Sequence, residues 1–119
     1  MNRKELKKKY IDTIQPMGIY QVRNLINGKI FIQSAVDLNG KINSCKFQLS
    51  MGSHMNKILQ ADYDNMGAEN FVFEILDSLK PKENIKMDYT KELKLLEHMW
   101  IEKLQPYGEQ GYHKRLISK

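Results

Sequence analysis

The sequence contains a single cysteine, Cys45, so no internal disulfide can form. A chain without a disulfide framework fits a reducing compartment. Its apolar runs are only a few residues long, too short for a helix that crosses a bilayer. The basic N-terminus is not followed by the apolar stretch of a signal peptide. We therefore expect a cytoplasmic protein that does not enter a membrane.

Several common chemical motifs are also missing. The sequence has no Cys/His cluster at zinc spacing, no glycine loop to cradle a phosphate, and no nucleophile elbow for a Ser-His-acid set. Its acidic residues are scattered, so no multi-carboxylate metal site is predicted. Zinc-finger, P-loop and serine-hydrolase chemistry are thereby disfavoured.

Positive charge is in excess. Lysine and arginine number 19 against 14 aspartate and glutamate, for a net charge of +5. A basic surface attracts phosphate backbones, although lysine-rich termini also serve solubility alone. The basic residues gather near the two ends, and we take as candidate nucleic-acid-binding residues Lys7, Lys8, Lys9, Lys114 and Arg115.

The length of 119 residues and the apolar share of 41% are typical of one compact domain. Residues 2–14 suit a charged helix, which Pro16 would end. We therefore divide the chain into a basic N-terminal helix over 1–16 and a folded domain over 17–119.

A β-hairpin is predicted next, with strands over 19–24 and 29–34 around Asn27-Gly28. Two loop lengths are open at this stage. A four-residue loop pairs Tyr20 with Gln33 and places both on one face with Phe31, whereas a two-residue loop moves Phe31 far from Tyr20.

The remaining pattern predicts a helix over 37–51, a second helix capped by Ser53 and stopped at Gly67, a strand over 71–79 and a last helix over 90–104. The strand over 71–79 is apolar on both faces, which is typical of a central strand covered on both sides. The sum is an α+β fold, a small antiparallel sheet with helices packed against it.

Two residues stand out by position. Glu97 lies inside the apolar stripe of the last helix, where a carboxylate needs a partner or a function. The alternative is a stripe-edge glutamate neutralised by a neighbouring lysine. His54 would lie in the first turn of a helix, where an imidazolium is disfavoured and a neutral ring can bind a phosphate or accept a proton. The alternative is an ordinary exposed histidine.

Taken together, these positions resemble the GIY-YIG nuclease superfamily, in the form of the catalytic module of homing endonucleases. The resemblance covers residues 18–113, and it is carried by Gly18-Ile19-Tyr20, 27–33, Ser34-Ala35, Gly52-Ser53-His54, 70–76, 96–101 and Gly111-Tyr112.

The resemblance implies a three-stranded antiparallel sheet flanked by helices that cleaves DNA with one divalent ion, Mg²⁺ or Mn²⁺. Tyr20 matches the first-strand tyrosine that helps to activate the attacking water. Glu97 matches the glutamate that holds the metal. His54 matches a histidine that some members place beside the phosphate.

Four positions depart from the family pattern. Phe31 lacks the hydroxyl of the second signature tyrosine, and Gln33 places a side chain where the family has glycine. Lys41 stands at the arginine position and brings charge without a planar fork. His113 replaces an asparagine that often follows Gly-Tyr.

The sequence therefore predicts a metal-dependent DNA endonuclease, slow or structure-selective, with Tyr20, Lys41, His54 and Glu97 as its catalytic residues. One alternative is a catalytically inactive module of the same fold that binds nucleic acid or regulates. Another is a protein-interaction domain without a DNA role. The partner that would supply targeting is not identified by the sequence.

Overall fold

The computed structural model describes residues 16–80 and 89–114. The helix expected over 2–14 lies outside these residues, as do Lys7, Lys8, Lys9 and Arg115. In the part of the chain that is described, no helix is long and apolar enough to cross a membrane.

Three antiparallel strands form the sheet, in the order β2-β1-β3. They are β1 (Met17–Asn24), β2 (Ile30–Ala35) and β3 (Phe71–Leu79). Three helices accompany them, α2 (Leu38–Ser50), α3 (Lys57–Met66) and α4 (Thr90–Leu104), with short 3₁₀ turns η1 (Ala68–Asn70) and η2 (Gly108–Gln110). The α+β fold with a three-stranded antiparallel sheet is confirmed.

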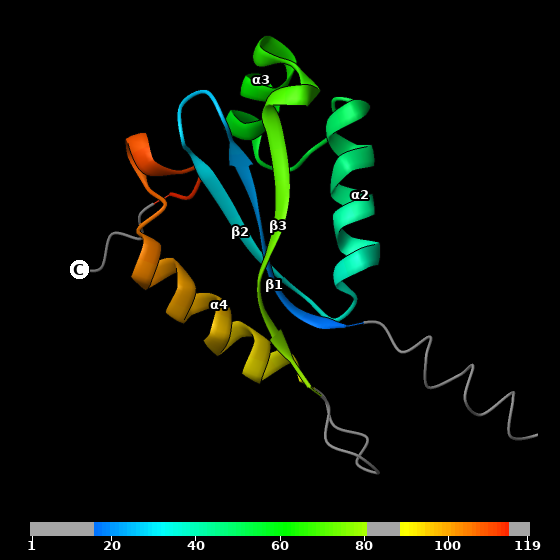
Figure 1. Cartoon of the computed structure of the whole chain (residues 1–119), viewed down its shortest axis with the longest axis vertical. Helices are drawn as coiled ribbons and strands as arrows, with labels where there is room; N and C mark the ends of the chain where they lie inside the picture. The colour runs from blue at the N-terminus through cyan, green and yellow to red at the C-terminus, as the bar shows by residue number, and fades with distance from the viewer. Residues whose placement is uncertain (1–15, 81–88, 115–119) are drawn as a thin grey trace, which may run out of the picture.

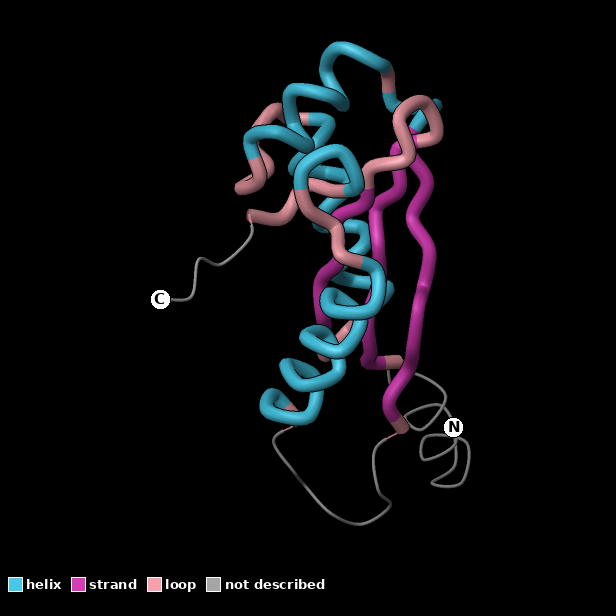
Figure 2. The backbone as a smooth tube through the Cα atoms, turned by 90° about the vertical axis from the view of Figure 1, so that its left-hand side faces the viewer, coloured by secondary structure: helices cyan, strands magenta, loops and turns pink. Residues whose placement is uncertain are grey.

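The helices α2 and α4 lie on opposite sides of the sheet (Figure 1). Tyr20 and Val22 belong to the buried cluster that includes residues of α2. Because side chains alternate along a strand, Ile19 points to the opposite face. Its cross-strand partner Asp77 accepts a hydrogen bond from Trp100 of α4 at 3.1 Å. Figure 2 views the molecule from this side, with α4 running along the strands.

The hairpin has the longer of the two loops considered. Tyr20 pairs with Gln33 and Val22 pairs with Phe31, as the four-residue loop predicts. Gly28 has a φ of 77°, a backbone conformation that glycine adopts without steric cost. The face that Tyr20 shares with Phe31 and Gln33 is therefore formed.

The prediction that the strand over 71–79 is central is wrong. The central strand is β1, in which every residue except Arg23 is buried, and β3 is an edge strand. A register shift opposite Ile19 and Tyr20 makes β3 one residue longer than its partner, which is a β-bulge. Ile75 on this strand is 52% exposed.

The helix over 37–51 is confirmed as α2, which begins after Asp37 although Gly40 lies in its first turn. The Asp37 side chain accepts a hydrogen bond from the Gly40 backbone N–H at 3.0 Å and so caps the helix.

The predicted cap at Ser53 is wrong, because α3 begins three residues later. Its cap is Asn56, whose side chain accepts from the Leu59 N–H at 3.0 Å. His54 therefore precedes the helix and does not lie in its first turn. The end of the helix at Gly67 is confirmed.

Candidate active site

The site begins with the cross-strand pair of Tyr20 and Gln33. The Tyr20 hydroxyl donates a hydrogen bond to Gln33 Oε1 at 2.6 Å. The Tyr20 side chain is fully buried, with an exposed fraction of 0%. Burial raises the pKa of Tyr20 far above its ordinary value, and nearby Cys45 and Glu97 raise it further. The hydroxyl therefore stays protonated at neutral pH, with Gln33 as its acceptor.

Phe31 lies between two imidazole rings. It stacks on His113 with centroids 5.1 Å apart and an interplanar angle of 9°, and it meets His54 edge-on at 5.3 Å and 86°. Phe31 thus packs against both histidines, and these ring contacts orient the planes of the two imidazoles.

Each imidazole accepts a hydrogen bond from the backbone. His54 Nδ1 accepts from the Asn56 N–H at 3.0 Å, and His113 Nε2 accepts from the Ile32 N–H at 2.8 Å. A nitrogen that accepts carries no proton, so each neutral ring has its proton on the other nitrogen. Both rings are therefore hydrogen-bond donors at their remaining positions.

Burial lowers the pKa of His54, and the charges of Lys41 and Lys57 lower it further, against an opposing contribution from Asn56. Burial also lowers the pKa of His113, while Glu97 acts in the opposite direction. Both rings are consequently neutral near pH 7.

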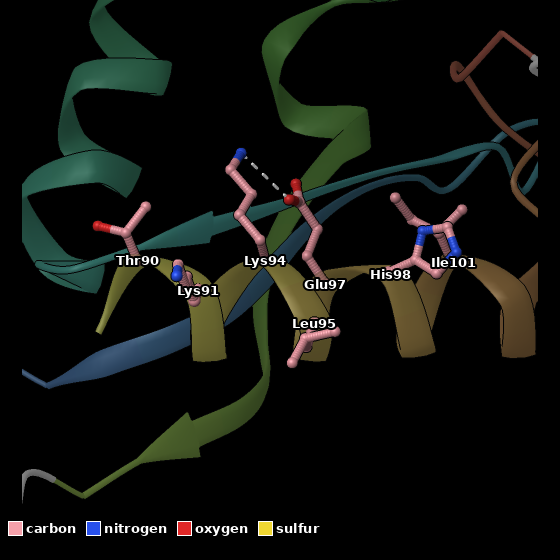
Figure 3. A pocket seen from close by; sticks show the side chains of 7 residues that line it. All are labelled: Thr90, Lys91, Lys94, Leu95, Glu97, His98 and Ile101. Carbon is pink, nitrogen blue, oxygen red and sulfur yellow. Dashed lines mark hydrogen bonds and ion pairs between the residues drawn. The ribbon is translucent and has the colours of Figure 1, made fainter. Parts of the chain in front are cut away.

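Glu97 projects from α4 toward the sheet and has a side-chain exposure of only 15%. Its Oε2 accepts from Ser34 Oγ at 3.4 Å and pairs with Lys94 Nζ at 3.4 Å (Figure 3). Its negative charge raises the pKa values of both Tyr20 and His113.

An open pocket of about 620 Å³ runs beside Glu97 on α4 (Figure 3). It is lined by Thr90, Lys91, Lys94, Leu95, Glu97, His98 and Ile101. The mostly buried Glu97 carboxylate thus borders open space, which Lys91 and Lys94 also line.

Lys41 lies in the first turns of α2, and its charge lowers the pKa values of both His54 and Cys45. It also lines a hollow of about 360 Å³ between the end of β2 and the start of α2. Lys114 lines a separate pocket of about 410 Å³, together with Lys57 and His113. Positive charge therefore borders the site on two sides.

The fold brings seven of the predicted site residues into one neighbourhood: Tyr20, Phe31, Gln33, Lys41, His54, Glu97 and His113. Three neighbours were missed by the sequence analysis, Ser34, Cys45 and Lys94. Lys94 could have been found, because it lies one helical turn before Glu97, and it is the lysine that the alternative explanation of Glu97 requires. Ser34 and Cys45 carry no local signal.

Within the described residues, no group of three or more histidine, cysteine or acidic side chains is arranged to hold a metal. This does not conflict with a magnesium site, because Mg²⁺ keeps several waters and binds through one or two carboxylates plus substrate phosphates. The Glu97 carboxylate beside its open pocket fits that donor set.

No family model matches this chain, and neither does any curated protein. Among solved structures, the catalytic domain of homing endonuclease I-TevI is similar, with 26% identity and a TM-score of 0.66 over 81% of this chain and 95% of that one. A mutant of the catalytic domain of intron endonuclease I-TevI is similar with 24% identity and a TM-score of 0.68 over 83% and 93%.

Proposed function

We propose that this chain, which has a GIY-YIG-like fold, is an endonuclease domain that hydrolyses DNA phosphodiester bonds with one Mg²⁺ or Mn²⁺ ion. The likeness to the catalytic domain of a homing endonuclease supports a nuclease-like function. The observation that carries the proposal is the position of Glu97. This carboxylate is 15% exposed, borders an open pocket and acts electrostatically on Tyr20 and His113.

A divalent ion held by Glu97 would polarise the scissile phosphate and stabilise the leaving oxygen. The chain itself supplies the donors around that position. The protonated nitrogens of His54 and His113 would hydrogen-bond phosphate oxygens, and Phe31 keeps both rings in orientation. Lys41 would add positive charge through its single ammonium group. Unlike an arginine guanidinium, that group does not make a planar, bidentate contact with a phosphate.

DNA is the proposed partner because cations surround this site. Lys41, Lys57, Lys94 and Lys114 all line the pockets on or beside it, and the whole chain has a net charge of +5. Each phosphate neutralised by a lysine releases condensed counterions, so the affinity should fall steeply with salt.

A second function is favoured by a different observation, the hydrogen bond from Tyr20 to Gln33. A tyrosine that is buried and donates its proton inside the protein is poorly placed to activate water. The alternative is therefore a catalytically inactive module that keeps the donors and cations of the site and binds nucleic acid without cleaving it.

Cleavage of supercoiled plasmid and branched DNA in Mg²⁺ or Mn²⁺ tests the proposal, with Glu97→Ala in parallel. The variant should lower the cleavage rate by about two orders of magnitude or more, because it removes the proposed metal ligand. Glu102→Ala is the matched control, since Glu102 is an exposed glutamate on the same helix, paired with His98. It should cleave like the wild type.

Absence of cleavage by the wild type, together with salt-sensitive DNA binding that Glu97→Ala leaves intact, would contradict the nuclease. That result would establish the inactive binding module. DNA binding no stronger than that of an unrelated protein of equal charge would contradict both functions.

A further inference from the structure

Gln33 faces Tyr20 directly across the hairpin, in the register that pairs the two residues. Directly opposite residues on one face of a strand pair lie close enough for their side chains to interact whenever the strands are paired. The contact is therefore a consequence of the strand register and does not depend on a loop or a terminus. At 2.6 Å from oxygen to oxygen it is a short hydrogen bond.

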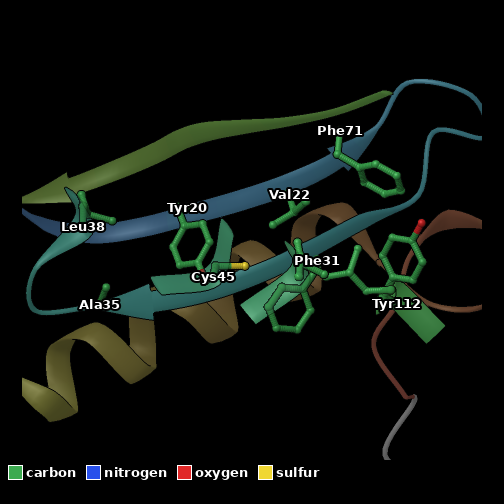
Figure 4. Close-up of a cluster of buried hydrophobic side chains, with 10 residues drawn as sticks. Tyr20, Val22, Phe31, Ala35, Leu38, Cys45, Phe71 and Tyr112 are labelled. Atoms are coloured by element: carbon green, nitrogen blue, oxygen red, sulfur yellow. The ribbon is translucent and has the colours of Figure 1, made fainter. Parts of the chain in front are cut away.

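The Tyr20 hydroxyl has one proton, and that proton points at Gln33 Oε1. The ring lies beside Cys45 of α2 in the buried cluster (Figure 4), and no part of the side chain reaches solvent. Gln33, in contrast, is only partly buried and lies on the edge strand β2. Gln33 is therefore a partly exposed partner of a hydroxyl that does not itself reach solvent.

The imidazole nitrogens that could accept a proton from water are occupied as well. The accepting nitrogens of His54 and His113 are engaged by the backbone N–H groups of Asn56 and Ile32. These two bonds are part of the local backbone structure, so freeing either nitrogen would disturb the fold. The bond to Gln33 differs because only side chains make it.

We infer that Gln33 is a positioning residue that holds the Tyr20 hydroxyl away from the attacking water and thereby limits the rate of DNA cleavage. This inference rests on the proposed function. By this inference, the rate of DNA cleavage is limited mainly by the side chain of Gln33. The absence of a tyrosine hydroxyl at Phe31 matters less.

The test is a gain of function. Gln33→Ala removes the acceptor and opens a path to the hydroxyl, and the single-turnover cleavage rate should rise by about tenfold or more. In the double variant Gln33→Ala/Tyr20→Phe the gain should disappear. Gln110→Ala, which removes an exposed glutamine from η2, is the matched control and should leave the rate unchanged.

A second measurement follows the hydroxyl without any DNA. In protein labelled with ¹³C-tyrosine, the Tyr20 signal is identified by its loss in Tyr20→Phe. Its chemical shift at neutral pH should differ between the wild type and Gln33→Ala, because the variant removes the acceptor of the Tyr20 hydroxyl, and an unchanged shift would overturn the inference. Circular dichroism of each variant confirms that the comparison is made between folded proteins.

The outcomes separate the inference from the proposed function. Equal rates for the wild type and Gln33→Ala, both abolished by Glu97→Ala, would overturn the inference and leave the nuclease standing. A gain that survives in the double variant would also overturn it, because the effect would not pass through Tyr20. No cleavage by any variant would overturn the proposed function and the role of Gln33 in the rate along with it.

Discussion

Among the residues that the structure describes, two tyrosines are buried, Tyr20 and Tyr112, and their hydroxyls have different hydrogen-bond partners. Tyr112 is 2% exposed, donates to Asp62 Oδ2 at 2.7 Å and accepts from Asn24 Nδ2 at 3.0 Å. Tyr20 is more deeply buried and donates to one neutral amide, that of Gln33. Hydrogen bonds to a charged acceptor are stronger than those to a neutral one.

Tyr112 also joins three separate parts of the chain. Its hydroxyl connects the end of β1 to α3 through Asn24 and Asp62. Its backbone carbonyl accepts from Asn56 Nδ2 at 2.8 Å at the start of α3. Burial raises the pKa of Tyr112, while the bond from Asn24 lowers it and Asp62 raises it again. The group we call the clamp, Asn24, Asp62 and Tyr112, is therefore built for stability.

Burial alone therefore does not distinguish a structural tyrosine from a functional one. The clamp satisfies its hydroxyl on both the donor and the acceptor side, so any change there leaves a buried polar group unpaired. The pair of Tyr20 and Gln33 is joined by one hydrogen bond between side chains, with Cys45 also beside the hydroxyl. Changes at the clamp should alter stability, and changes at the pair should alter chemistry.

The largest effect on stability is expected from Asn24→Ala in the clamp. The Asn24 side chain is fully buried, donates to Tyr112 and accepts from the Ile26 N–H at 2.8 Å. Alanine would leave these groups unpaired, at a cost of about 2–4 kcal/mol in the free energy of unfolding. Urea denaturation measures this, with Asn65→Ala on the exposed side of α3 as the control. A loss below about 0.5 kcal/mol would show that the clamp does not stabilise the fold.

Smaller losses in the free energy of unfolding are expected when either tyrosine hydroxyl is removed. Tyr112→Phe should cost about 1–2 kcal/mol, because it leaves a carboxylate and an amide without their partner. Tyr20→Phe should cost about 1 kcal/mol or less, because Gln33 is partly exposed and can turn to water. Urea denaturation and the cleavage rate are measured on both variants. If Tyr112→Phe lowered the cleavage rate of a fully folded protein, the purely structural role of Tyr112 would be contradicted.

The sequence was most informative where local rules decide the structure. Asn27-Gly28 between two apolar runs gave the hairpin, and the strand period then placed Tyr20 and Gln33 together once the loop length was known. The last helix, with Glu97 in its apolar stripe, was predicted with its observed ends, Thr90 and Leu104. These features depend on a few consecutive residues.

Features that depend on distant residues were not predictable. The strand over 71–79 reads as central because both of its faces are apolar, yet the strand order makes it an edge, and strand order is a property of the whole chain. Cys45 beside Tyr20 is likewise a tertiary contact. The cap of α3 is a local feature, and it was misplaced because Ser53 and Asn56 are both favourable capping residues and only the bonds of His54 to Asn56 and Gln60 decide between them.

The smallest expected effect is a dependence of the free energy of unfolding on pH. It comes from His54 and His113 in the candidate active site and not from the clamp. Burial lowers the pKa of His54 and of His113 below the ordinary value of 6.5 in the folded protein. At a pH between the folded and unfolded values, the unfolded chain therefore binds more protons than the folded one. The free energy of unfolding must then rise with pH in this window. The contribution of the two imidazoles is complete above about pH 6.5, and it decreases as the pH falls below that value.

Urea denaturation between about pH 7.5 and pH 5.5 measures this slope in a range where unperturbed carboxylates remain ionised. His113→Gln should reduce the slope, because it removes one of the two rings that the fold keeps neutral. His98→Gln, which removes an exposed histidine on α4, is the control. Tyr112→Phe should shift the whole curve without changing its slope, since the clamp tyrosine does not titrate in this range. A slope of the opposite sign would mean that the two imidazoles are charged in the fold, and it would remove the basis for treating them as neutral donors to a phosphate.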